Sequence, residues 1–131
     1  MFGMGLCFIT KKGEHVAVHI AANLDICNKT LRETIGKNSK TSADDLVEVF
    51  SSGFGMINPF NSLFDDIVHY VDSSVQNLTM GTTNAGVRGR FVYFNPKEHF
   101  EQGVAIGKFK KGVVYGDFAR KNIELDIDKV L

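Results

Sequence analysis

The chain has 131 residues, of which 44% are hydrophobic and 23% charged, and this fits one folded domain over 1–131 with a single core. Its 15 basic and 15 acidic residues cancel, so it lacks the global charge that nonspecific nucleic-acid binders use. No apolar run reaches the roughly 20 residues of a membrane span, and no basic signal-peptide segment opens the chain. We expect a cytoplasmic protein without a membrane partner, whose near-zero charge is compatible with homo-oligomers.

A β-hairpin is predicted at the start of the chain, with strands over residues 6–12 and 14–20. In HVAVHI the valines and the isoleucine share one face, as the two-residue period of a strand requires. The turn is KKG at 11–13, because glycine tolerates the positive φ of a hairpin loop. His15 and His19 face the same way but lie about 13 Å apart at ~3.3 Å per residue, so they cannot chelate one metal ion.

Three helices are predicted next. The first extends from a cap at Asp25 to about Ile35 and ends at Gly36, and the second follows a cap at Ser42. The third, over 59–78, has the strongest pattern, because its apolar residues recur at the i, i+3, i+4, i+7 spacing of one helix face. We expect it to lie across the sheet and form half of the core through Phe60, Leu63, Phe64, Ile67, Val68, Val71, Val75 and Leu78.

Four strands are predicted in the last third of the chain, over 90–94, 103–109, 113–118 and 123–127. A second KKG, at 110–112, is read as the turn of another hairpin. The resulting order ββ-ααα-ββββ indicates an α+β fold. Its sheet would be mostly antiparallel, built from the N- and C-terminal strands, with the helices packed on one face.

Neither a metal nor a cofactor is expected. Cys7 and Cys27 lie in apolar patterns outside any Cys-x-x-Cys motif, which is typical of buried free cysteines. His69 could meet Asp65 or Asp72 on a helix, but there is no third ligand. Phosphate loops, dinucleotide fingerprints and nucleophile elbows are also missing, so no catalytic residue is favoured.

The leading functional interpretation is a non-catalytic module that binds another protein. The loop SSGFGMINPF holds Phe54, Met56 and Ile57 between glycines, where they either fold back onto the core or serve as apolar anchors. Asp65, Asp66 and Asp72 on the predicted third helix, with Glu124 and Asp126 on the last strand, would form an acidic rim. This combination suits a basic partner, most concretely a toxin neutralised by a bacterial immunity or antitoxin-type protein.

The alternative interpretation is a small metal-independent ribonuclease. In RGRFVYFNPKEHF, His99 or Glu98 would transfer protons, while Arg88, Arg90 and Lys97 would bind phosphate. Nucleic acid is an expected partner only under this interpretation. The neutral net charge argues against it.

Overall fold

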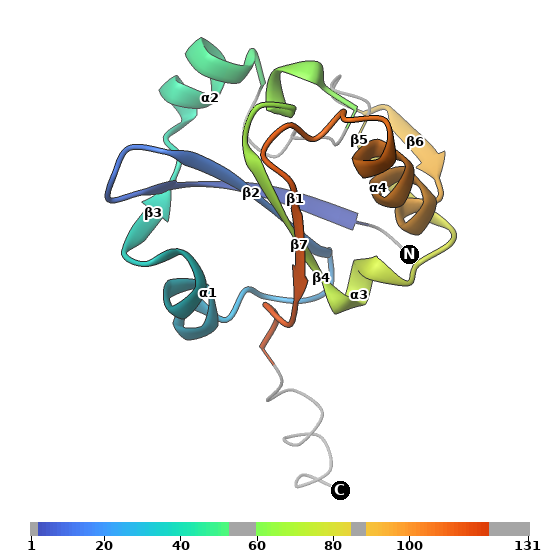
Figure 1. Ribbon diagram of the computed structural model, residues 1–131, viewed down its shortest axis with the longest axis horizontal. Coiled ribbons are helices and arrows are strands. Elements are labelled where there is room, and N and C mark those ends of the chain that lie inside the picture. The colour runs from blue at the N-terminus through green and yellow to red at the C-terminus, as the bar shows by residue number, and fades with distance from the viewer. Residues whose placement is uncertain (1–2, 53–59, 85–88, 121–131) are drawn as a thin grey trace, which may run out of the picture.

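The computed structural model describes residues 3–52, 60–84 and 89–120 and confirms the α+β class (Figure 1). The strands are β1 (Gly3–Thr10), β2 (His15–Ala21), β3 (Asn38–Lys40), β4 (Val68–Asp72), β5 (Gly81–Asn84), β6 (Phe91–Phe94) and β7 (Val113–Gly116). The helices are α1 (Asn28–Ile35), α2 (Ala43–Phe50), α3 (Ser73–Gln76) and α4 (Pro96–Ala105), with a short 3₁₀ turn, η1 (Ser62–Phe64).

The main sheet has the strand order β3-β1-β2-β4-β7, and β5 pairs with β6 in a separate small sheet. The predicted N-terminal hairpin is confirmed: β1 and β2 are antiparallel, and Gly13 in the turn has a φ of 83°. β3 also pairs antiparallel with β1, whereas β4 runs parallel to both β2 and β7. Parallel strands must be joined by a crossover connection. The connection between β4 and β7 contains α3, the small sheet and α4, and it places them next to the main sheet.

The predicted long helix over 59–78 is wrong. Of its residues from Phe60 onward, which the structure describes, 62–64 form η1, 68–72 form β4, and only 73–76 are helical. The run Val68–Val71 combines β-branched and aromatic residues, and β4 is a central strand with one face buried and the other half-buried. The apolar residues of such a short segment satisfy helical spacing as well, so the periodicity alone did not distinguish a helix from a strand.

The predicted strand over 103–109 is also wrong, because α4 continues to Ala105. Asn95 caps this helix by accepting a hydrogen bond from the backbone N–H of Glu98, and Pro96 occupies the first turn. The second KKG therefore precedes β7 without forming a hairpin, although Gly112 does adopt a φ of 92°. The expected strand over 123–127 lies outside the described residues.

The two earlier helices are close to their predictions. Ser42 caps α2 as expected, accepting a hydrogen bond from the N–H of Asp45. α1 starts later than predicted, with Cys27 and not Asp25 at its cap position, and it ends at Gly36 with a φ of 80°.

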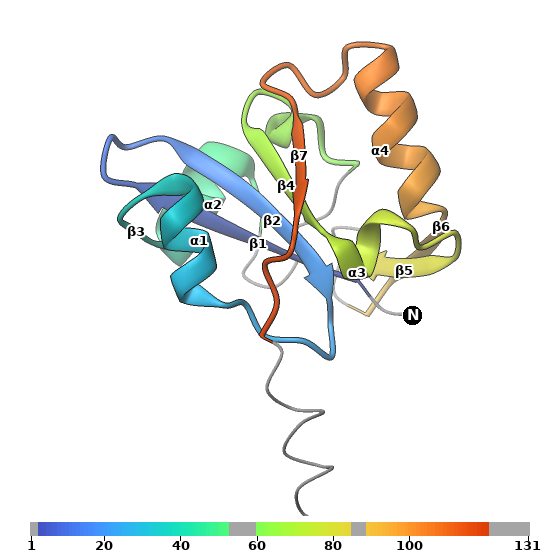
Figure 2. The ribbon, with the colours of Figure 1, turned by 60° about the horizontal axis from the view of Figure 1, so that its bottom comes forward.

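The helices cover both faces of the main sheet, not one as expected. Figure 2 shows α1 in front of the strands and α2 behind them. On the α1 face, the core consists of Phe8, Val16, Val18, Ile20, Leu31 and Phe118. On the opposite face, two clusters pack under α2 and under α3 with α4: Cys7, Leu46, Phe50 and Phe64, then Val71, Val75, Phe100 and Phe109. Both faces need cover because the central strands β2 and β4 carry apolar residues on each side.

In the described part of the chain, no helix has the length and apolar character needed to cross a membrane.

Candidate functional site

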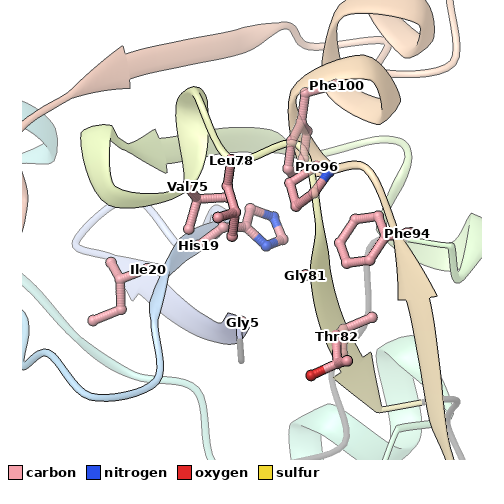
Figure 3. Close-up of a pocket in the computed structure, with 11 residues that line it drawn as sticks. Gly5, His19, Ile20, Val75, Leu78, Gly81, Thr82, Phe94, Pro96 and Phe100 are labelled. Carbon is pink, nitrogen blue, oxygen red and sulfur yellow. The ribbon is translucent and has the colours of Figure 1, made fainter. Parts of the chain in front are cut away.

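A small cavity lies where the main sheet meets α3, the β5–β6 sheet and the start of α4 (Figure 3). It leaves about 20 Å³ open to the centres of water-sized molecules, which is room for one or two waters. Most of its wall is apolar, and the polar side chains are one histidine and two threonines. The lining residues are Gly5, His19, Ile20, Val75, Leu78, Gly81, Thr82, Thr83, Phe94, Pro96 and Phe100.

The segments that form the walls of the cavity are connected to one another by strand pairing and by backbone hydrogen bonds. Gly5 of β1 lies opposite His19 of β2 in the hairpin, so both face the cavity side of the sheet. Gly81 of β5 pairs with Phe94 of β6. The N–H of Lys97, in the first turn of α4, donates to the carbonyl of Leu78 at 3.0 Å. The cavity therefore has a rigid frame built from regular elements.

Two histidines on adjacent parallel strands form a buried pair at this cavity. His19 Nε2 and His69 Nδ1 are 2.9 Å apart, and the two rings are parallel to within 3°. The other ring nitrogen of His69, Nε2, lies 2.6 Å from the carbonyl oxygen of Phe64. Both side chains are almost fully buried, with 5% of His19 and 1% of His69 exposed.

Burial keeps both rings neutral. The pKa of His19 lies well below its ordinary value of 6.5 because burial disfavours the charged form, and the neighbouring His69 and His99 lower it further. Burial also lowers the pKa of His69, although its hydrogen bond to the Phe64 carbonyl and the nearby Asp65 carboxylate oppose this shift. At neutral pH the pair is therefore two uncharged imidazoles.

Aromatic rings pack around the pair. The ring of Phe100 lies 5.0 Å from that of His19, and the ring of Phe109 lies 4.7 Å from that of His69, centre to centre. Phe109 in turn covers Gly103 on α4, where an added Cβ would come within 2.2 Å of its ring. These contacts fix the orientation of both imidazoles.

The predicted protein-binding surface is only partly described. Phe54, Met56, Ile57, Glu124 and Asp126 lie outside the described residues, so their role stays a prediction.

The acidic face expected on a third helix does not form, because that helix does not exist. Asp65 follows η1 and makes an ion pair with Lys108, with Nζ and Oδ1 2.7 Å apart. Asp66 is exposed. Asp72 is buried: its carboxylate caps α3 through the N–H of Ser74 and accepts hydrogen bonds from the N–H groups of Phe118 and Ala119. It therefore holds β4 against the segment after β7, where no partner could reach it.

The residues of the ribonuclease interpretation are spread over different surroundings. Arg88 lies outside the described residues, and Arg90 is exposed. On α4, Lys97 makes an ion pair with Glu101 at 2.9 Å, while Glu98 accepts a hydrogen bond from Gln102. The His99 ring packs beside aromatic rings, with centroids 4.6 Å from Phe60 and 5.8 Å from Phe109.

The sequence did not single out the cavity. His19 was weighed only as a metal ligand, and no strand was predicted over the residues of β5. The described residues contain no cluster of three or more His, Cys, Asp or Glu that could hold an ion, and the expectation that no metal is bound stays a prediction. One signal in the sequence could have indicated a buried histidine. His15, Ala17 and His19 share one face of a strand whose other face is apolar, and a strand that is buried on both faces must bury its histidines too.

The fold is shared with solved structures of low sequence identity. A candidate trans-editing enzyme for prolyl tRNA synthetase superimposes with a TM-score of 0.70 at 15% identity, over 92% of this chain and 71% of that one. The hypothetical protein APE2540 gives 0.67 at 19% identity, over 91% and 74%. A structure from the computational grafting of epitope backbones onto scaffold proteins gives 0.74 at 12%, over 92% and 72%. Likenesses at such identities establish the fold alone. No curated protein sequence matches the chain.

The model of one protein family, the aminoacyl-tRNA editing domain, matches residues 5–100, which is more than two thirds of the chain. This match overturns the interpretation as an immunity or antitoxin-type protein, and with it the expected toxin partner, because the family acts on aminoacyl-tRNA. The ribonuclease alternative is set aside on the same finding. By sequence, the chain belongs to the aminoacyl-tRNA editing domain family.

Proposed function

We propose that this protein hydrolyses the ester that joins a small amino acid to the 3′ end of a tRNA, and that the cavity at His19 binds the amino acid. The observation that carries this proposal is the coincidence of the family match with the cavity. The matched segment begins at Gly5 and ends at Phe100, and these are the first and last residues of the chain that line the cavity.

The size of the cavity favours a small amino acid. The space that it leaves open to water-sized molecules is only about 20 Å³. Val75, Leu78 and Phe100 would meet anything larger, and two of them, Val75 and Phe100, are held in a buried cluster with Val71 and Phe109. A steric limit of this kind lets a hydrolase spare amino acids that do not fit.

The few polar groups of the lining suit an ester. Thr82 and Thr83 of β5 and His19 of β2 are the lining residues whose side chains carry hydrogen-bonding groups. A mostly apolar pocket with a few convergent polar groups is the usual form of a small-molecule site. The partner in this proposal is an aminoacyl-tRNA, and the proposed location is the cytoplasm, where such esters are made and used.

The test is a deacylation assay with the purified protein. One tRNA is charged, in separate batches, with radiolabelled glycine, alanine, serine, cysteine, valine, leucine or phenylalanine, and the loss of acid-precipitable label is followed over time. We expect the protein to accelerate loss of one or more of the four small amino acids above the spontaneous rate and to leave leucine and phenylalanine unaffected. Equal and spontaneous rates for every ester, at micromolar protein, would refute the proposal.

A further inference from the structure

We propose that His19 is the base that takes a proton from the attacking water in this hydrolysis, and that His69 is the positioning residue that holds His19 in the required tautomer. This inference rests on the proposed function, since it names the group that performs its chemical step. It concerns two residues 50 positions apart in the chain that parallel strands bring together.

The tautomers follow from one fixed acceptor. A backbone carbonyl can only accept a hydrogen bond, so His69 must carry its proton on Nε2, which lies 2.6 Å from the oxygen of Phe64. A neutral His69 then has a bare lone pair on Nδ1. Because this atom lies 2.9 Å from His19 Nε2, His19 must be the donor and must carry its own proton there. The remaining nitrogen of His19, Nδ1, is left with an unprotonated lone pair.

The free nitrogen of His19 faces the cavity. The ring lines the cavity in Figure 3, and its Nε2 side is engaged with His69. Across the described residues, every fully buried side-chain nitrogen or oxygen has a hydrogen-bond partner, and no described residue serves as a partner for His19 Nδ1. This nitrogen is therefore reached by solvent from the cavity, which has room for one or two waters.

The arrangement supports a balanced hydrolytic step. A water in the cavity gives a proton to His19 Nδ1, and its oxygen attacks the carbonyl carbon of the aminoacyl ester. The tetrahedral intermediate collapses by breaking the bond to the ribose oxygen, which takes the proton back from the imidazolium. The products are the free amino acid and a tRNA with its terminal hydroxyl restored. Throughout the step His19 Nε2–H continues to donate to His69.

The charged and titratable groups around the pair come from several elements. His69 faces His19 from β4, and His99 acts on both rings from α4. Asp65, after η1, and Lys108, before β7, act on His69 and pair with each other. Because burial holds the pKa of His19 well below 6.5, its Nδ1 is available as an acceptor at all neutral pH values.

Kinetics of matched variants test the role of His19. In His19→Gln the amide can still donate to His69, but no imidazole accepts a proton. We expect kcat for the small aminoacyl-tRNA to fall by about 10²- to 10⁴-fold with little change in KM. His15→Gln is the control, because His15 is on the same strand and face but packs against Thr41 and Phe50, away from the cavity. Its deacylation rate should match that of the wild type.

The role of His69 has its own readout. In His69→Phe, His19 loses its acceptor and its tautomer is no longer fixed, so kcat should fall while KM is kept. In His69→Gln the amide can accept from His19 and donate to Phe64, so much of the activity should return. If His69 had only a structural role, His69→Phe and His69→Gln variants with equal thermal melting points would also have equal kcat values.

The tautomers and the pH dependence of the rate can be measured on the wild type, so this test does not depend on whether a variant folds. Long-range ¹H–¹⁵N NMR spectra at pH 7 should show both histidines protonated on Nε2 and bare on Nδ1. After subtraction of spontaneous hydrolysis, the rate should stay flat from pH 8 to below 6.5. Finding the His19 proton on Nδ1 would overturn the proposal.

The outcomes separate this inference from the function on which it rests. If the wild type deacylates tRNA and folded His19→Gln does so equally well, His19 is not the base and the proposed function stands. If the wild type deacylates no substrate, both proposals fall, whatever the NMR spectra show.

Discussion

His19 and His69 illustrate how a single buried contact can combine structure and chemistry. A neutral pair linked to the Phe64 carbonyl satisfies every buried nitrogen except the one that opens to the cavity. The sequence placed only His19 on a strand. His69 was read as part of a helix, and a partner 50 residues away leaves no local signal. The side-chain alternation of β2 was nevertheless predicted correctly, and it placed His15 and His19 on the same face.

The buried pair should make the protein sensitive to mild acid. In the folded state both pKa values lie below 6.5, so the unfolded chain binds more protons as the pH falls through 6.5. The free energy of unfolding should have its highest value above that pH and should decrease below it, by at most about 1.4 kcal/mol per pH unit for each histidine. Urea unfolding at pH 8, 7, 6 and 5 measures this slope.

A variant tests whether the buried histidines cause this dependence of the free energy of unfolding on pH. His19→Gln removes one of the two titrating groups, so its stability should fall less steeply between pH 6.5 and 5 than that of the wild type. A wild-type stability that stays constant or rises over the same interval would contradict the burial of two neutral imidazoles.

Among the secondary-structure elements, two terminus signals were predicted correctly, whereas the Asp25 cap, the second KKG hairpin and the helix over 59–78 were wrong. Ser42 and Gly36 marked a helix start and a helix end correctly, because their effects depend on local backbone hydrogen bonds. β4 was mistaken for a helix, since its strand state is imposed by pairing with β2 and β7, which lie far away in the sequence. The end of α4, which includes Gly103, was predicted to belong to the strand over 103–109. Gly103 is instead a position inside the helix where the ring of Phe109 packs.

Gly103→Ala tests that packing. A Cβ at this position would lie 2.2 Å from Cε2 of Phe109, so the ring would have to move away from its contacts with His69 and Phe100. We expect a loss of about 1–3 kcal/mol in the free energy of unfolding, in spite of the better helix propensity of alanine. Chemical denaturation measures it. Val104→Ala, at the next and half-exposed position, is the control and should change stability by less than about 0.5 kcal/mol. A stabilised Gly103→Ala variant would show that Phe109 does not press on the helix.

At the scale of the whole molecule, the fold class could be predicted from the sequence and the site could not. Strands at the start, helices in the middle and a helix-and-strand C-terminal part are enough for an α+β assignment. The cavity depends on two parallel crossovers that place β5, β6 and α4 beside the N-terminal hairpin. Its wall is drawn from residues between Gly5 and Phe100 with no contiguous motif, so no spacing rule could have found it. Only the family match over the same segment indicated its chemistry.

The central claim is that the amino acid of a charged tRNA binds in this cavity, and enlarging the cavity tests it most directly. Leu78→Ala removes a lining side chain, so it should admit valine and reduce the wild-type preference for alanyl- over valyl-tRNA by about 10-fold or more. Deacylation rates of both esters by the wild type, Leu78→Ala and the surface control Val104→Ala measure this preference. The account predicts a relaxed preference in Leu78→Ala alone. An active Leu78→Ala variant that keeps the wild-type preference would place the amino acid elsewhere and contradict it.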